Sequence, residues 1–351
     1  MMKKLYRKYL SAFIAIMLIS PAMLFAGNKD RTGEAGASEI LINPWGASSG
    51  WGNCNTASVR GIEGTFMNIA GTAFTKGTDV KFSYTFYVGQ INLLTAGLSQ
   101  QVGKTGVLSI YISNMAFGEI PIIHADDPDL PKGVYSPNSL NIGLAYAKVF
   151  SNSIYGGIQV KLINQSLYNL SATGVAFDVG IQYVTGKKDN LKFGITLKNW
   201  GPNMKFSGDG QSIRVNVSGK GENQFTLQIR SATYELPSQL LIGLSYDFIT
   251  ETEYRFTLAG TFISNAFAKD QIALGLEISL KEYLILRGGY TYEQGIFNFD
   301  TRTTLFSGPS CGLTVNIPVN KQTRNGFGLD YSYRFTNPFG GVHTVGVTVD
   351  F

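Results

Sequence analysis

The sequence predicts an all-β protein: a transmembrane antiparallel β-barrel of about 14 strands with an N-terminal hatch inside the lumen. Three observations predict this fold class. Apolar and polar residues alternate along many long segments, the chain ends on an aromatic residue, and its first 26 residues resemble an export signal. Alternation with a period of two gives a strand one apolar face, and about 9–11 residues cross a membrane as a tilted strand.

Alternation dominates the chain from residue 79 to its end. In one segment Phe193, Ile195 and Leu197 alternate with Gly194, Thr196 and Lys198. We expect strands at about 79–87, 90–102, 105–116, 139–150, 153–164, 172–185, 189–199, 237–248, 253–264, 270–280, 283–293, 308–317, 325–335 and 342–351. Their number is even, as in most single-chain bacterial barrels. The pattern of segment 211–230 is compatible with a further hairpin, but we assign the segment to a loop.

The links between these strands predict the orientation of the barrel. If the C-terminus faces the periplasm, most short links are periplasmic, and the outer loops include the long segments 117–138 and 200–236. Outer-membrane barrels show this asymmetry. The last strand carries Val347 and Val349 and ends on Phe351. A terminal aromatic residue on an alternating strand resembles the signal that the barrel assembly machinery recognises.

Residues 1–26 are typical of a signal peptide. Basic residues precede an apolar run from Tyr9 to Phe25, and no later segment reaches 18 consecutive apolar residues. This excludes a helical membrane protein, and the run is short for the alternative of a single anchor helix. The net charge of +5 belongs mainly to this leader, because without its four basic residues 25 basic and 24 acidic residues remain. This charge balance predicts that nucleic acid is not a partner. The export signal and the barrel together predict a location in the outer membrane, in contact with its lipids.

Residues 27–78 do not alternate well and are rich in glycine. A barrel of fourteen strands is wider than one of eight, whose interior side chains alone can fill. We therefore expect 27–78 to form the hatch and 79–351 to form the barrel. Cys54 falls in the predicted hatch and Cys311 on the lipid-facing phase of a strand, so a disulfide between them is not expected.

Charged residues on the polar phase of their strands are expected in the lumen. These residues are Lys81, Asp178, Lys192, Arg255, Glu277, Arg287 and Asp330. Glu277 and Arg287 flank one hairpin and are placed to pair. A polar path for cargo is one interpretation. Mutual neutralisation and hydrogen bonding to the hatch is the interpretation that we favour.

The sequence gives little support for catalysis, a cofactor or a metal. The two histidines, His124 and His343, fall in separate regions, which argues against a lipid-hydrolysing barrel with a Ser/His pair. Asp126, Asp127 and Asp129 offer carboxylates to calcium, but a solvated turn among prolines explains them better. We expect a protein that is not an enzyme and holds no cofactor.

Several short motifs resemble a known family. Segments 34–42 and 57–63 precede Asn68, Ala70 and Gly71, which match an Asn-Pro-Ala-Gly pattern in which isoleucine here replaces proline. Further similarity lies in 234–246 and in the loop 117–138. Together these segments, spread over nearly the whole mature chain, resemble the PorV/PorQ family, which belongs with the FadL-type fourteen-stranded barrels.

The resemblance implies a role in type IX secretion. Such barrels receive cargo proteins with C-terminal sorting domains from a large translocon barrel and pass them to a surface attachment complex. The expected contact residues are Ile120, Ile122, Ile123 and Tyr135 in an outer loop, where function concentrates on a rigid scaffold. FadL-type relatives instead admit hydrophobic molecules, which is the alternative. A dry apolar pocket in the lumen would favour the channel, and a filled lumen with an open loop cleft would favour cargo handling.

Overall fold

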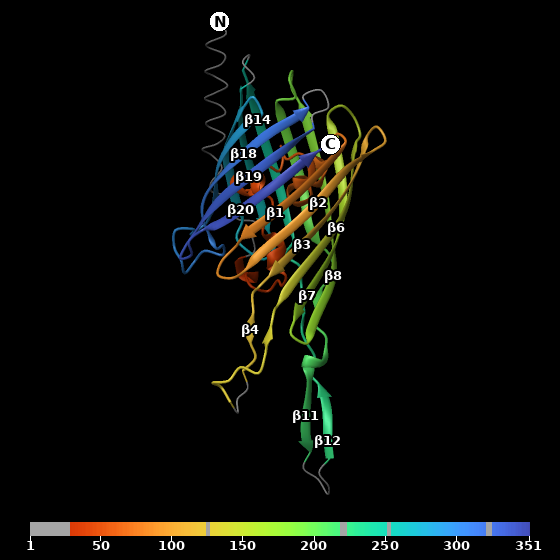
Figure 1. The fold of residues 1–351 in the computed structure, drawn as a ribbon, viewed down its shortest axis with the longest axis vertical. Coiled ribbons are helices and arrows are strands. Elements are labelled where there is room, and N and C mark those ends of the chain that lie inside the picture. The colour runs from red at the N-terminus through yellow and green to blue at the C-terminus, as the bar shows by residue number, and fades with distance from the viewer. Residues whose placement is uncertain (1–28, 124–126, 218–222, 251–253, 321–324) are drawn as a thin grey trace.

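The computed structural model describes residues 29–123, 127–217, 223–250, 254–320 and 325–351 (Figure 1). Fourteen strands form one closed antiparallel barrel, and β20 pairs with β1 to complete the ring. They are β1 (Thr78–Phe86), β2 (Asn92–Val102), β3 (Gly106–Ala116), β6 (Asn138–Val149), β7 (Ile154–Leu167), β8 (Leu170–Thr185), β9 (Leu191–Trp200), β14 (Gln239–Ile249), β15 (Tyr254–Asn265), β16 (Gln271–Leu280), β17 (Leu284–Glu293), β18 (Phe306–Asn320), β19 (Asn325–Thr336) and β20 (Val342–Asp350). The predicted fold class is confirmed. The predicted leader lies outside the described residues.

The side chains of the wall alternate as the sequence predicts. In β9 the outward residues Phe193, Ile195 and Leu197 are exposed, whereas Lys192 and Lys198 point inward and are buried. Exposed apolar side chains recur on every strand of the ring. This outer face is the surface that a barrel presents to hydrocarbon. No helix in the described ranges is long and apolar enough to cross a membrane.

The two ends of the barrel differ in the length of their links. At one end, the C-terminal rim, the links are short, and Phe351 bonds to Thr78 through both backbone groups at 2.9 and 3.1 Å. At the other end, the long-loop rim, the links include 117–137, 201–238 and 294–305. Of the predicted assembly signal, Val347 and Phe351 are exposed, and Val349 is half-buried.

The expected strands 153–164 and 172–185 leave 165–171 as a loop, and this prediction is wrong. There β7 and β8 continue to a two-residue turn, and their ladder includes the pair Leu167↔Leu170. Tyr168 makes this turn with a φ of 52°. The longer ladder satisfies backbone groups that a loop would leave to water.

The assignment of 211–230 to a loop without strands is also corrected. β11 (Ser212–Val217) and β12 (Asn223–Gln228) pair as a hairpin that projects from the long-loop rim (Figure 1). The 3-10 turn η5 (Asp209–Gln211) precedes it. Two smaller sheets lie in the same rim: β4 (Ile120–Pro121) with β5 (Val134–Tyr135), and β10 (Met204–Lys205) with β13 (Thr233–Tyr234).

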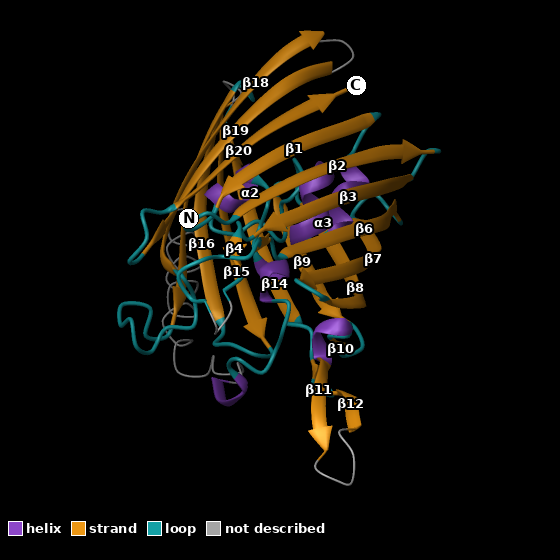
Figure 2. Ribbon diagram, turned by 60° about the horizontal axis from the view of Figure 1, so that its bottom comes forward, coloured by secondary structure: helices purple, strands orange, loops and turns teal. Residues whose placement is uncertain are grey.

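The N-terminal segment lies inside the barrel as a hatch. Its short helices are η1 (Lys29–Arg31), η2 (Ser38–Leu41), α2 (Gly46–Gly50), η3 (Gly61–Glu63), α3 (Gly64–Met67) and η4 (Ile69–Phe74), and Figure 2 shows α2 and α3 within the ring of strands. It starts at the long-loop rim, where Arg31 bonds to Glu235 at 2.6 Å. It ends at the C-terminal rim, where Gly77 N donates to Gln101 Oε1 at 3.2 Å. The hatch therefore spans the lumen from rim to rim.

Glycines on the inner face of the wall bring the hatch backbone close to it. A Cβ on Gly194 would lie 2.5 Å from the carbonyl oxygen of Thr56, and one on Gly289 would lie 2.5 Å from that of Trp51. Real Cβ atoms do not approach backbone so closely. These positions therefore require glycine for close backbone approach.

Candidate functional site

Two large cavities lie on opposite sides of the hatch. The long-loop cavity, of about 380 Å³, opens between the hatch and the long-loop rim. The C-terminal cavity, of about 490 Å³, lies between the hatch and the C-terminal rim. Both volumes fall in the range of small-molecule sites.

The long-loop cavity has mainly apolar walls. Side chains of the hatch, of eight wall strands and of the links between strands contribute, including Leu41, Phe66, Met67, Met115, Leu241, Ile263 and Ile296. Met67, Leu241 and Ile263 belong to one buried cluster, with Phe66 packed against it. The hatch and the wall thus form one apolar surface.

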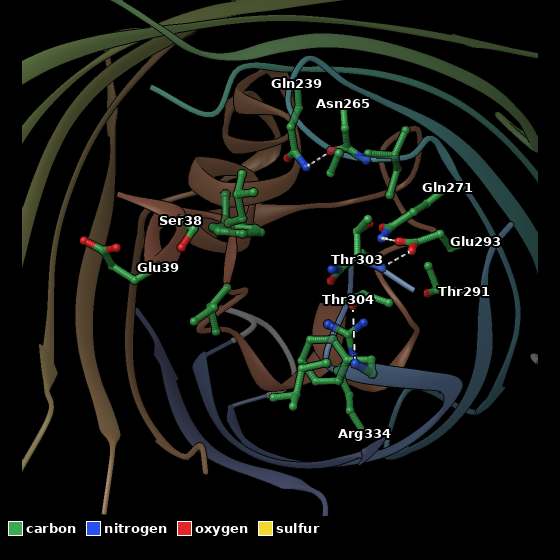
Figure 3. A pocket seen from close by; sticks show the side chains of 18 of the residues that line it. Ser38, Glu39, Gln239, Asn265, Gln271, Thr291, Glu293, Thr303, Thr304 and Arg334 are labelled. Carbon is green, nitrogen blue, oxygen red and sulfur yellow. Dashed lines mark hydrogen bonds between the residues drawn. The ribbon is translucent and has the colours of Figure 1, made fainter. Parts of the chain in front are cut away.

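The carboxylates of this cavity accept hydrogen bonds from uncharged donors. Glu293 accepts from Gln271 Nε2 at 3.0 Å and from the backbone N of Thr303 at 2.5 Å (Figure 3). Glu39 accepts from Ser139 Oγ at 2.7 Å and from Gln165 Nε2 at 2.6 Å. In the part of the chain that the structure describes, neither carboxylate forms an ion pair.

Two cations of the cavity lie against aromatic rings instead. The guanidinium carbon of Arg334 is 3.6 Å from the ring centre of Phe306, and Lys198 Nζ is 3.6 Å from that of Phe66. Both side chains are buried, and the Nε of Arg334 has no hydrogen-bond partner. Among the described residues, no ion pair joins either cation to a carboxylate. A buried cation without an ion-pair partner is costly, so an anionic group would be stabilised at these two side chains, although the cavity as a whole also holds the carboxylates of Glu39 and Glu293.

The hatch is tied to the long-loop rim beside this cavity. The hydroxyl of Tyr234 donates to Gln165 Oε1 at 2.6 Å, and Gln165 in turn donates to Glu39 of the hatch. Burial, with the nearby charge of Glu39, raises the pKa of Tyr234 to about 12. The hydroxyl therefore remains a donor at neutral pH.

Paired charges line the C-terminal cavity. A chain of contacts runs around the wall through Lys81, Asp330, Thr314, Arg287, Glu277, Arg255, Thr257, Asp247 and Lys192. Glu277 lies at its centre, 2.8 Å from Arg255 Nη1 and 2.7 Å from Arg287 Nε. Outside this cavity, Asp178 pairs with Lys161 at 2.7 Å. The lumen charges named from the sequence thus lie in ion pairs, as mutual neutralisation requires.

One hatch carboxylate joins this network. Glu63 accepts from Lys81 Nζ at 2.5 Å and from the backbone N of Ser48 at 3.0 Å. A hatch cation, Arg60, donates to Gln182 Oε1 at 2.7 Å and stacks on Phe74. Burial lowers the pKa of Arg60 to about 10, so it stays charged at neutral pH. The charged residues therefore attach the hatch to the wall, in addition to pairing with one another.

The hatch motif has a structural role. Asn68 Oδ1 accepts from Ala70 N at 3.1 Å, and Asn68 Nδ2 donates to the carbonyl oxygens of Thr56 and Ile181, both at 3.1 Å. A Cβ on Gly71 would lie 2.5 Å from the carbonyl oxygen of Val59. These residues fix a hatch turn against β8.

The predicted contact residues lie in the link 117–137 of the long-loop rim, and none of them lines either cavity. Ile120 and Ile123 are exposed, and Ile122 and Tyr135 are half-buried. His124 and Asp126 lie outside the described residues, and no group of three metal-ligating side chains occurs in the described part of the chain. Cys54 is buried and Cys311 exposed, each as a free thiol.

Sequence reasoning did not single out Lys198 and Arg334. Both have the inward parity of their strands, since Leu197 and Tyr333 face outward and Arg334 follows Asp330 at an even spacing. Parity would have placed them in the lumen. It would not have shown that they lack a carboxylate partner, which depends on neighbouring strands and the hatch.

Comparison with solved structures finds barrels of similar fold. The CymD monoaromatic hydrocarbon channel matches with a TM-score of 0.57 and 11% identity, over 89% of this chain and 98% of that one. The toluene transporter TodX of Pseudomonas putida matches with a TM-score of 0.56 and 12% identity, over 88% and 97%. A Pseudomonas aeruginosa FadL homologue matches with a TM-score of 0.52 and 12% identity, over 87% and 98%.

The barrel has the FadL-like fold. At these identities the likeness is one of architecture, and it extends over nearly the full length of each FadL-like structure. No family model and no curated protein matches the chain. The narrower PorV/PorQ resemblance therefore stays a prediction.

Proposed function

We propose that this protein is an outer-membrane channel that admits a small hydrophobic molecule bearing an anionic group. The observation that carries the proposal is the pair of buried cations, Lys198 and Arg334, in the apolar long-loop cavity. Apolar walls favour a hydrocarbon body, and the cations favour a carboxylate or a similar anion at its end. The names of two similar structures, a hydrocarbon channel and a toluene transporter, agree with the hydrophobic part of this substrate class.

The position of the cavity supports entry from outside the cell. Long loops face outward in outer-membrane barrels, which puts the long-loop rim on the outer surface. The hatch fills the lumen below the cavity, so a direct path to the C-terminal rim requires the hatch to move.

The wall beside the cavity offers a second exit. The ladder between β17 and β18 stops at Tyr290↔Pro309, although β17 continues to Glu293. Thr291, Glu293 and Phe306 at this interruption line the cavity. Pro309 has no N–H to donate, so the interruption is built into the sequence. We place the sideways exit into the membrane here.

Replacing Lys198 or Arg334 with methionine is expected to weaken the binding of dodecanoate by roughly 10-fold or more, as the loss of a charge-assisted hydrogen bond implies. Dodecanol has the same hydrocarbon chain without the charge. Its affinity for either variant is expected to lie within about 2-fold of its affinity for the unmodified barrel, a change of well under 1.4 kcal/mol. Titration of the purified barrel with both ligands measures the difference.

The matched control is Lys205→Met, because Lys205 is an exposed cation of the same rim outside the cavity. It should leave both affinities unchanged. Equal affinities of the unmodified barrel for acid and alcohol would contradict the proposed role of the cations.

Handling of secreted cargo is the second candidate function. The outer loop 117–138 carries exposed apolar side chains at Ile120, Ile123, Leu130 and Val134. Exposed apolar patches favour protein contacts. We propose that cargo C-terminal domains, a large translocon barrel and a surface attachment complex are the partners in this case. Purification of the tagged barrel from native outer membranes tests it: proteins with a shared sorting domain would support cargo handling, and a barrel that carries only lipids or fatty acids would reject it.

A further inference from the structure

We propose that the outer wall of the barrel holds a site for the headgroup of an anionic phospholipid at the C-terminal rim, centred on Lys148 of β6. The site faces lipid and lies outside both cavities, so the inference does not depend on what the long-loop cavity binds. It rests on the orientation of the barrel, which puts the C-terminal rim in the periplasmic leaflet of the membrane.

Lys148 is a cation on the lipid-facing side of the wall. It is the last residue but one of β6, at the C-terminal rim, and its side chain is exposed. It has the outward parity of Leu144 and Tyr146, which are also exposed. A lysine in this position lays its alkyl stem along the hydrocarbon and keeps its ammonium group at the level of the lipid headgroups.

Glycines and aromatic rings surround this lysine on the outer wall. In the ladders of β6 with β3 and β7, Lys148 is paired with Gly106 and with Gly156 (Figure 1). A Cβ on Gly106 would lie 2.8 Å from the hydroxyl oxygen of Tyr146, and one on Gly156 would lie 2.9 Å from the ring of Phe150. Lys148 therefore stands between two aromatic side chains, with a hydroxyl group next to it on one side.

No carboxylate neutralises this lysine in the part of the chain that the structure describes. Lys148 forms no ion pair there. The neighbouring links 103–105 and 150–153 hold no acidic residue, and the first carries a second exposed lysine, Lys104. The backbone N of Val149 donates to Thr105 O at 2.9 Å, which fixes this link beside the end of β6. A phosphate group here would meet two cations and a hydroxyl donor.

The wall around the lysine fits the acyl chains of the same lipid. Farther from the rim, the outward side chains of β3, β6 and β7 are apolar and exposed: Leu108, Ile110, Leu144 and Ile158. A phospholipid thus gains apolar contact as well as charge, whereas a soluble phosphate gains only the charge. Basic residues at a membrane surface attract anionic lipids, and tyrosine favours the same interface. A zwitterionic headgroup brings its own cation toward Lys148, so an anionic headgroup is preferred.

Native mass spectrometry of the purified barrel tests the proposal. The probes are phosphatidylglycerol and phosphatidylethanolamine with the same acyl chains, added in equal amounts. We expect the unmodified barrel to retain phosphatidylglycerol several-fold more than phosphatidylethanolamine. Lys148→Gln should lower the retained phosphatidylglycerol by about 5-fold, the effect of one basic residue at an anionic surface. Replacing Lys104 with glutamine as well should remove the preference.

The matched control is Lys188→Gln. Lys188 is an exposed lysine of the same rim, in the link between β8 and β9, and the acidic Asp189 follows it. Its replacement should leave the retained phosphatidylglycerol unchanged, and every variant should keep the heat-modifiable mobility of a folded barrel on gels.

Three results would overturn the proposal. The first is equal retention of the two lipids by the unmodified barrel, and the second is an undiminished preference for phosphatidylglycerol in the double variant. The third is an equal loss in Lys188→Gln, which would show attraction by the whole rim instead of a site. Excess soluble glycerol phosphate should not displace the lipid, and complete displacement would contradict the role of the acyl chains.

Discussion

Replacing Glu277 with alanine is expected to lower the free energy of unfolding of the barrel by about 3–5 kcal/mol, the usual cost of removing one partner of a buried ion pair. The carboxylate contacts Arg255 at 2.8 Å and Arg287 at 2.7 Å, and it is 5% exposed. Its loss leaves Arg287 buried without a carboxylate. Urea unfolding of the barrel in lipid vesicles measures the change.

Glu282 is the matched control for this prediction. It accepts from the same Arg255 at 3.1 Å, but its side chain is 62% exposed. Water and salt screen such a pair, so Glu282→Ala should cost only about 0–1 kcal/mol. If both variants lost the same free energy of unfolding, burial would not explain the contribution of Glu277 to stability.

Replacing Gly289 with alanine is expected to displace the hatch. The new methyl group would lie 2.5 Å from the carbonyl oxygen of Trp51 and 2.6 Å from its carbonyl carbon, and neither atom can yield without moving the hatch backbone. Overpacking of this kind costs about 1–3 kcal/mol. We expect a loosened hatch, measured as several-fold higher ion conductance of single barrels in planar bilayers.

The neighbouring glycine provides the control. A Cβ on Gly288 would meet no atom within 4 Å, because this residue faces the opposite side of the wall. Gly288→Ala should therefore leave conductance and stability unchanged. A closed barrel in Gly289→Ala, with the conductance of the unmodified protein, would show that the hatch does not seal the lumen at this contact.

The two lumen cavities differ in what a substrate would encounter. The long-loop cavity combines apolar walls with two cations that lack carboxylates, whereas acidic and basic side chains neutralise each other in the C-terminal cavity. Such pairing stabilises the wall and the hatch, and the seven acidic against five basic side chains that line this cavity disfavour an anion there. The first cavity is therefore the better candidate for selective binding.

Local sequence determined the strands of this protein. A period of two is a property of neighbouring residues, so Phe193, Ile195 and Leu197 reveal both a strand and its outward face before any partner is known. The same parity placed Glu277 and Arg287 together inside the wall. The absence of alternation in 27–78 likewise predicted a segment that fills the lumen.

Tertiary structure decided the contacts that depend on several segments at once. Lys198 and Arg334 have the same parity as paired lumen charges, and only the path of the hatch and the neighbouring strands leaves them beside aromatic rings. Likewise, the sequence of 211–230 leaves a loop and a hairpin open, and the pairing of β11 with β12 decides for the hairpin. Parity fixes the side of a strand on which a residue lies, but the residue it meets there is set by register and packing across the barrel.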